Sequence, residues 1–254
     1  MRWLAMDLHV HTVLSGCADI EMVPPRIVQA ALALGLAAIA ITDHNSAENV
    51  EATQQAAQGA GLVVFAGMEV QTREEVHLLA LFGQAEQARA LQAAVYERLP
   101  AEPNRPEHFG EQLVVDALGR YVAAEPRLLQ VSVSLGIEEA AVLIRRLGGL
   151  CLAAHVDRPS YSVFANLGFI PPALLLDGAE ASKNADPGEL AAAHKDLAGL
   201  GVGAFGDAHR LAELTARTQF FVQEPTIEEV GLALHRRQGR TLRVAPIRIR
   251  SSHT

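Results

Sequence analysis

The sequence has few of the features that mark several common classes of protein. Its 254 residues include two cysteines, and neither belongs to a Cys-x-x-Cys pair, so no disulfide framework is expected. No run of Lys or Arg exceeds two residues, and the formal net charge is −8. No nucleic-acid partner is therefore evident from electrostatics, and a small-molecule partner is expected instead.

Long hydrophobic runs are also missing. The longest, Ala30 to Ile41, is interrupted by Gly35 and is too short to span a bilayer. The segment Met1–Asp7 lacks the apolar core of a signal peptide. We therefore expect no membrane partner and, given the unpaired cysteines, a reducing cytoplasmic location. Oligomeric state has no signature in the sequence.

Half of the residues are hydrophobic, and they gather in strand-length runs separated by helical patterns. Continuous apolar runs are typical of strands buried on both faces. Repeated βα units without a GxGxxG motif after the first strand favour a closed parallel α/β barrel over a doubly wound nucleotide-binding sheet. The expected strands are Leu4–Val10, Ala37–Thr42, Leu62–Val70, Val76–Leu81, Leu150–His155, Leu175–Glu180, Val202–Gly206 and Gln219–Val222. The expected helices are Arg26–Leu34, Ser46–Ala60, Glu86–Glu97, Ile137–Leu147, Glu189–Leu200 and Thr226–Gln238.

One segment, residues 100–127, breaks this rhythm. Four prolines are spread through polar sequence there, with one short strand-like or helical patch near Leu113–Leu118. A loop of this length in a compact enzyme is uncommon unless it covers a site or is mobile. We expect a single domain over residues 1–254, with residues 100–127 as an irregular excursion.

Metal-ligating side chains follow the expected strands. His9 and His11 are two residues apart, so both imidazoles point to the same side of a strand. Catalytic groups of a barrel come from the carboxyl ends of several strands, and His, Asp and Glu without paired thiolates describe a hydrolytic metal cluster. The other members of this set are His44, Glu69, His77, His155, Asp207 and His209. By their positions, His108, His194, His235 and His253 are not expected to be ligands.

Five short motifs together resemble those of the polymerase and histidinol phosphatase (PHP) superfamily of metal-dependent phosphoesterases. The resemblance covers nearly the whole chain, and it rests on five motifs in the right order because each alone is weak. The motifs are Asp7-Leu8-His9-Val10-His11-Thr12, Ile41-Thr42-Asp43-His44-Asn45, Gly67-Met68-Glu69-Val70 with Val76-His77-Leu78-Leu79, Ala154-His155-Val156-Asp157-Arg158, and Gly206-Asp207-Ala208-His209.

This resemblance implies a distorted (β/α)7 barrel of the TIM type that holds two or three divalent ions, Zn, Mn or Fe. It implies that His9, His11, Glu69 and Asp207 hold one ion and are the catalytic set. Glu69 would bridge to a second ion on His77 and His155, and His44 with His209 would hold a third. A metal-activated water would be the nucleophile, and the substrate would be a small phosphorylated metabolite or nucleotide.

The first motif departs from the family pattern at its end. Family members commonly have an Asp or His five or six residues after the second histidine, where this chain has Gly16 and Cys17. A Cys17 thiolate could take that place, Asp19 could reach it, or neither residue could. The identity of the ion and the choice between phosphatase and phosphodiesterase stay open.

Three polar residues near the same strand ends are candidates for substrate contact. Arg158 follows His155, and a guanidinium matches phosphate oxygens. Lys183 and Asn184 follow the sixth expected strand and therefore face the same mouth. Asp43 is either a helix cap or a carboxylate that orients an imidazole.

Two other functions compete with phosphoester hydrolysis. An amidohydrolase barrel also opens with His-x-His, but it typically brings a bridging Lys on a middle strand, where this chain has Glu69. The unusual Gly16-Cys17 pair agrees with a metal-binding or regulatory module that has lost turnover.

Overall fold

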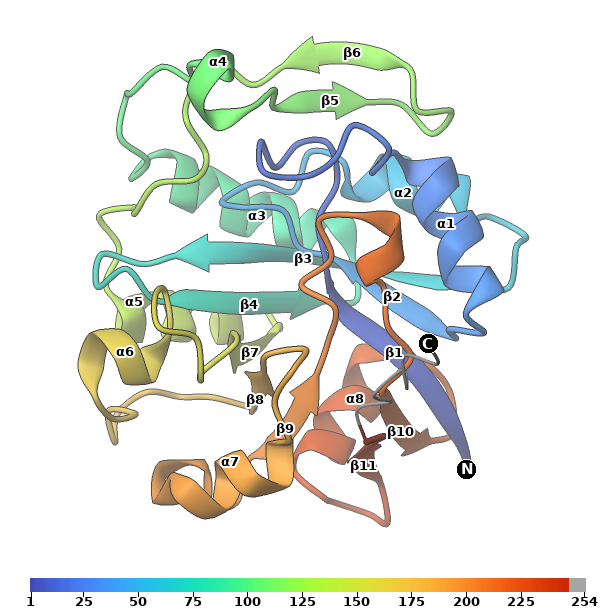
Figure 1. Cartoon of the computed structure of the whole chain (residues 1–254), viewed down its shortest axis with the longest axis vertical. Coiled ribbons are helices and arrows are strands. Elements are labelled where there is room, and N and C mark those ends of the chain that lie inside the picture. The colour runs from blue at the N-terminus through green and yellow to red at the C-terminus, as the bar shows by residue number, and fades with distance from the viewer. Residues whose placement is uncertain (247–254) are drawn as a thin grey trace, which may run out of the picture.

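A computed structural model of the protein describes residues 1–246, and within them nine strands form one curled sheet (Figure 1). The order across the sheet is β11-β10-β1-β2-β3-β4-β7-β8-β9, and the two end strands, β11 and β9, contact each other. The predicted α/β barrel class is therefore confirmed, as a nearly closed barrel. The strands are β1 (Arg2–Val10), β2 (Ala38–Ile41), β3 (Val63–Gln71), β4 (His77–Phe82), β7 (Leu150–Ala153), β8 (Gly178–Ala181), β9 (Gly201–Ala204), β10 (Thr218–Val222) and β11 (Thr241–Val244).

The sheet is mixed, which corrects the expectation of parallel strands throughout. β4 runs antiparallel to both β3 and β7, and β10 runs antiparallel to β1 and β11. Only the tight turn 72–76 joins β3 to β4, whereas a parallel pair needs a crossover of a dozen or more residues. This reversal pairs His77, the first residue of β4, with Gln71 at the carboxyl end of β3. His77 thereby lies at the same rim as Glu69.

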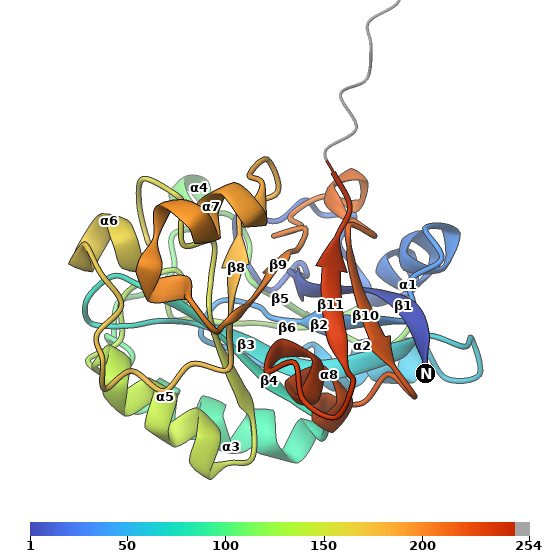
Figure 2. The same ribbon diagram turned by 90° about the horizontal axis from the view of Figure 1, so that it is seen from below.

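Helices pack against the strands (Figure 2), and six of them overlap the expected ranges, whereas the short helices Pro106–Phe109 and Val163–Leu167 were not expected. The expected helix Glu189–Leu200 ends at Ala193 and continues as a 3₁₀ turn, Lys195–Leu197. None of the described helices combines the length and the apolar character needed to cross a membrane. The helices are α1 (Pro24–Ala33), α2 (Val50–Ala56), α3 (Ala85–Tyr96), α4 (Pro106–Phe109), α5 (Ile137–Arg146), α6 (Val163–Leu167), α7 (Pro187–Ala193) and α8 (Ile227–Leu234).

The 100–127 segment contains α4 and a small hairpin of β5 (Leu113–Val115) and β6 (Tyr121–Ala124), at the top of Figure 1. It packs on the loop that follows β1: the Leu113 amide donates to the carbonyl of Val13 at 2.9 Å. The two backbones approach closely: a Cβ on Gly110, which has a φ of 81°, would clash with the carbonyl of Gly16, and a Cβ on Gly16 would clash with the carbonyl of Phe109. The segment therefore fixes the loop that carries Cys17.

Candidate metal centre

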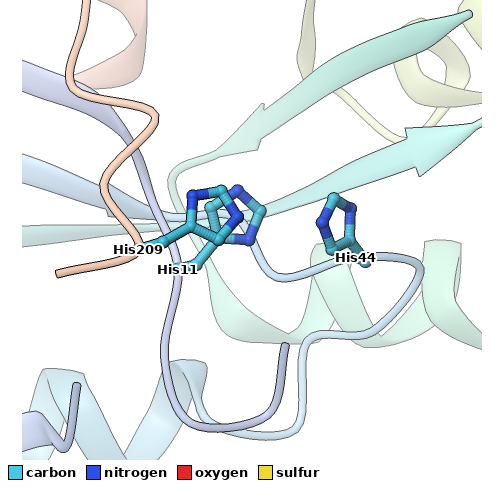
Figure 3. Close-up of side chains that lie close together, drawn as sticks. All are labelled: His11, His44 and His209. Atoms are coloured by element: carbon cyan, nitrogen blue, oxygen red, sulfur yellow. The ribbon is translucent and has the colours of Figure 1, made fainter. Parts of the chain in front are cut away.

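Six imidazoles and two carboxylates meet at one rim of the barrel. His9 and His11 come from the end of β1, Glu69 from β3 and His77 from the start of β4. Figure 3 shows His11, His44 and His209 lying close together although they come from three distant parts of the sequence. The two remaining members of the cluster, His155 and Asp207, lie two and three residues after the ends of β7 and β9.

Glu69 is at the centre of this group and is almost fully buried. Its Oε1 lies 2.7 Å from His77 Nδ1, 3.2 Å from His155 Nε2 and 3.3 Å from His9 Nε2. Its Oε2 lies 2.9 Å from His44 Nδ1. Burial alone would raise the pKa of Glu69, but the surrounding histidines, His77 first, hold it well below its ordinary value. Glu69 is therefore an ionised carboxylate with both oxygens directed at imidazoles.

Glu180, inside β8, fixes the orientation of His9. The Nδ1–H of His9 donates to Glu180 Oε2 at 2.8 Å, because a carboxylate can only accept. The Nε2 of His9 then faces the cluster and is the nitrogen that would bind a cation. The same Oε2 accepts the backbone N–H of His155 at 3.0 Å. One carboxylate thus positions two of the predicted ligands.

A second buried carboxylate, Asp43, orients His11 through Ser15. The Ser15 hydroxyl donates to Asp43 Oδ1 at 2.7 Å, so it accepts from His11 Nδ1 at 2.9 Å. His11 Nε2 is then free to bind a cation. Asp43 also accepts the backbone N–H and the hydroxyl of Thr12. Of the two roles considered for Asp43, the structure therefore favours orientation of an imidazole, and α2 begins seven residues later at Val50.

The donor atoms fit divalent cations. His77 Nε2 and His155 Nδ1 are buried and have no hydrogen-bond partner among the described residues, and His44 Nδ1 and Glu69 Oε2 have none apart from their approach to each other at 2.9 Å. Unpaired buried polar atoms are costly unless a proton or a metal ion satisfies them. Three sets have ligand atoms within 4.8 Å of one another: His9 with His11 and Glu69, His44 with Glu69 and His77, and His11 with His44 and His209. These three sets share more residues with one another than the three expected metal sites do, because His44 lies close to Glu69 as well as to His209.

Two ligand positions have strained backbones. His155 and Asp207 have φ values of 25° and 44°, in the left-handed backbone region that residues other than glycine rarely adopt. Each residue directly follows the end of its strand or lies within three residues of it. Such strain persists only where the surrounding structure enforces it, and it concentrates at functional sites.

The structure distinguishes between Cys17 and Asp19, the two residues that could replace the missing ligand of the first motif. Cys17 Sγ lies 3.5 Å from His44 Nε2. The Asp19 carboxylate instead accepts the amide of Glu21 at 3.0 Å. Burial alone would raise the pKa of the Cys17 thiol, but hydrogen bonds from His209 and His44 lower it to about 7. Cys17, and not Asp19, faces the histidines.

A cavity of about 490 Å³ opens over the cluster, and the three predicted substrate residues line it. Arg158 donates to Asp207 Oδ2 at 2.6 Å, and Lys183 pairs with Glu213 at 2.9 Å. Asn184 and Arg210 complete the polar wall. We call this cavity the mouth of the metal centre. Three basic side chains, those of Arg158, Lys183 and Arg210, line it beside the exposed edge of the histidine cluster.

Sequence reasoning did not assign a role to several of these residues. Glu180 carried a signal, a lone charge inside a buried strand, but its partners are 25 and 171 residues away. Tyr161 follows the same strand as Arg158 and was a candidate for substrate specificity, but its stacking on His77, with ring centroids 5.0 Å apart, was not predicted. Among the four histidines set aside, His108 is exposed, His194 stacks on Phe164 and His235 pairs with Asp177. The fourth, His253, lies outside the described residues.

Comparison with known families identifies this arrangement. The family model of the PHP domain matches residues 7–162, more than half of the chain, which include His9 through His155. The chain belongs to the PHP domain family. Membership supports a metal-dependent hydrolase and agrees with the His and Glu clusters at the rim. No curated relative matches the chain in sequence.

Solved structures share the fold at low sequence identity. The lesion-specific endonuclease PfuEndoQ from Pyrococcus furiosus is 21% identical, with a TM-score of 0.73 over 95% of this chain and 58% of that one. Endonuclease Q in complex with a 27-mer duplex substrate has a TM-score of 0.69 and 20% identity over 94% of this chain and 58% of that one. A putative metal-dependent phosphoesterase from Bifidobacterium adolescentis has a TM-score of 0.55 and 21% identity, covering 82% and 88% of the two chains. The chain thus spans 58% of the length of each endonuclease.

The endonuclease complex corrects one prediction. Because Endonuclease Q, which shares this fold, has been solved in complex with a duplex that has an abasic lesion at the active site, the prediction that no nucleic-acid partner is evident was wrong. The error has a physical cause, since net charge sums over the whole chain and conceals its distribution. Residues 230–254 contain six arginines and no Asp or Glu, so the rest of the chain is more acidic than the total indicates.

Proposed function

We propose that the protein is a metal-dependent phosphoesterase and that its substrate is a phosphodiester of a nucleic acid. The observation that carries this proposal is the juxtaposition at one rim: a buried set of imidazoles and carboxylates with unsatisfied donor atoms lies under a mouth lined by three cations. The endonuclease complex supports the choice of nucleic acid as the substrate class.

The ligands of the ions would be the predicted set. His9, His11, Glu69 and Asp207 would hold one ion, and Glu69 would bridge to a second on His77 and His155. His44, His209 and Cys17 would complete a third site, with Cys17 supplying sulfur where the family has oxygen or nitrogen. Bound divalent ions supply a water of lowered pKa and stabilise negative charge on phosphoryl oxygens.

The protein's own residues would bind and orient the substrate. Arg158, half exposed at the mouth, uses one Nη atom on Asp207 and has further N–H donors that match phosphate oxygens. Lys183 and Arg210 face the same cavity. Asn184 would contribute an amide to the substrate from the same wall. Glu180 and Ser15 would keep the imidazoles in the tautomers that leave Nε2 unprotonated.

Hydrolysis by the metal-loaded protein tests this function. Zinc, manganese and iron forms would be assayed with bis(p-nitrophenyl) phosphate and with labelled oligonucleotides, single-stranded and duplex, with and without an abasic site. We expect metal-dependent cleavage that a chelator stops and that added ion restores. His11→Ala should lower the rate about 100-fold, because it removes a ligand, whereas His108→Ala, an exposed imidazole on α4, should leave it unchanged.

The result that would contradict this proposal is the absence of phosphoester cleavage. If no metal-loaded form cleaves any of these phosphoesters, the proposed function is wrong. Tight metal binding in that same protein would then identify a metal-binding module without turnover.

A further inference from the structure

A smaller cavity of about 200 Å³, which we call the inner chamber, adjoins the mouth over the metal-ligating side chains. The two spaces are continuous because they share five lining residues: Cys17, His155, Arg158, Asp207 and His209. The walls of the inner chamber also include Gln130 and Tyr161, which belong neither to the ligand set nor to the proposed substrate contacts. Pockets for drug-sized ligands typically enclose about 300–1,000 Å³, so a chamber of this size holds no more than about one nucleotide.

The side chain of Tyr161 is held in place against a predicted ligand. Its ring stacks on the imidazole of His77, with centroids 5.0 Å apart and an interplanar angle of 20°, and its carbonyl accepts the His77 amide at 3.1 Å. The neighbouring Ser162 hydroxyl donates to the carbonyl of Arg158 at 2.6 Å and accepts the amide of Ala165 at 3.1 Å. Tyr161 itself has a φ of 57°, a strained value of the kind that concentrates at functional sites. The loop therefore positions this ring before any substrate binds.

One face of the Tyr161 ring is open. The residue is 43% exposed, and because His77 covers one face of the ring, the exposed area lies on the opposite face and the edge. Within residues 1–246, no other aromatic ring stacks on it, no guanidinium lies over it, and its hydroxyl makes no hydrogen bond. An aromatic ring offers a large apolar area for contact, and the fold covers only part of this one. Tyr161 thus presents a flat surface beside the metal-ligating imidazoles.

The inner chamber combines this surface with a cation. Arg158 also lines it, and a guanidinium matches phosphate oxygens. A nucleotide carries both complementary groups, an anionic phosphate and a flat base. Bases of every type stack on aromatic side chains, because each has a π-face. In a chamber of this size, one nucleotide can contact Arg158 and Tyr161 together.

We propose that Tyr161 stacks on the base of a nucleotide that adjoins the scissile phosphodiester. This inference rests on the proposed function. The ring lies between His77 on one face and the base on the other, while Arg158 binds the phosphate of the same nucleotide. The contact depends on the presence of a base and tolerates any base, so an abasic residue at this position loses it.

Binding of phosphorothioate-linked dinucleotides, which resist hydrolysis, to the metal-loaded protein tests the stacking contact. One base of each dinucleotide is 2-aminopurine, whose fluorescence falls when it stacks on an aromatic ring. With the probe on one of the two sides of the linkage, we expect quenching by the wild type and by Tyr161→Phe, which keeps the ring. Tyr161→Leu should abolish the quenching and raise Kd about 5- to 100-fold, the range expected for loss of a base–aromatic stack.

A dinucleotide that lacks the base on that side separates stacking from an effect on the metal centre, since Tyr161→Leu also removes the ring from His77. Isothermal titration calorimetry should give the same Kd for this abasic dinucleotide in Tyr161→Leu and in the wild type. The control Tyr121→Leu, at an exposed tyrosine of β6, should bind both dinucleotides as the wild type does.

Equal loss of affinity with and without the base, or no quenching of the probe on either side of the linkage, would overturn the stacking contact. Wild-type hydrolysis of bis(p-nitrophenyl) phosphate, measured in parallel, separately tests the proposed function. Hydrolysis without quenching contradicts the stacking contact alone, whereas quenching without hydrolysis contradicts the catalytic function alone.

Discussion

At the scale of single residues, two buried carboxylates that bind no substrate set the state of the histidines. Glu180 accepts from His9 and from the backbone of His155, and Asp43 acts on His11 through Ser15. A neutral imidazole can bind a metal through only one nitrogen, so fixing the proton on Nδ1 decides which nitrogen faces the cluster. Asp43 belongs to the second motif, whereas Glu180 and Ser15 lie outside all five, so the ligand set depends in part on residues that the motifs do not contain.

Replacement of Glu180 tests this dependence. Glu180→Gln keeps the shape of the side chain but removes the negative charge that supports the Nδ1–H of His9, so His9 is oriented less firmly and becomes a weaker ligand. We expect metal affinity to fall about 10–100-fold, as is typical when a residue that orients a ligand is changed. Competition titration with a chromophoric chelator measures it. Glu224→Gln, at an exposed position, should have no effect, and an equal affinity in the two variants would refute the orienting role.

Sulfur ligation by Cys17 has a spectroscopic test. A thiolate bound to cobalt(II) produces an intense charge-transfer absorption that nitrogen and oxygen ligands lack. Cobalt-loaded protein should show this band, and the band should disappear in Cys17→Ser and persist in Cys151→Ala, because Cys151 is buried in the core. Bound metal should also protect Cys17 from alkylation. A cobalt spectrum that Cys17→Ser leaves unchanged would exclude the sulfur ligand.

At the scale of secondary structure, the sequence predicted what local pattern controls. Apolar runs located the main strands, and the two-residue spacing of His9 and His11 placed both imidazoles on one side. The reversal of β4 was not predicted, because its run is as apolar as that of a parallel strand and only the short turn before it decides direction. The role of Glu180 was not predicted because its partners meet it only when β1 and β7 close around β8.

Close packing of β2, β3 and β4 explains the glycine at position 67, two residues before Glu69. A Cβ on Gly67 would lie 2.8 Å from the carbonyl oxygen of Ile41 and 2.9 Å from that of Ala80. Because these are backbone atoms that cannot swing aside, Gly67→Ala should lower the free energy of unfolding by about 1–3 kcal/mol. Urea denaturation measures the change. Gly83→Ala, whose Cβ would have only Ile227 at 4.0 Å, should stay within about 0.5 kcal/mol, and equal stability of the two variants would contradict this account.

At the scale of the whole molecule, charge is distributed unevenly. Acidic residues outnumber basic ones in the whole chain, 29 to 21, while three basic side chains line the mouth over the histidine cluster. Composition could not show this, because Arg158, Lys183 and Arg210 come from three separate loops that the barrel brings together. Electrostatic attraction of a polyanion depends on this local arrangement and weakens with salt.

The metal centre should also stabilise the barrel as a whole, because its ligands come from strands spread across most of the sheet. An ion that binds only the folded protein adds about 2.7 kcal/mol when present at 100 times its Kd. In a chain of this size that corresponds to an increase of about 5–10 °C in Tm for each ion. Differential scanning calorimetry before and after chelation, and again after reloading, should show the loss and its recovery. In Glu69→Gln, which lacks the ionised carboxylate at the centre, the chelator should change Tm much less. If chelation leaves the Tm of the wild type unchanged, then the clustered side chains do not hold ions that join the strands.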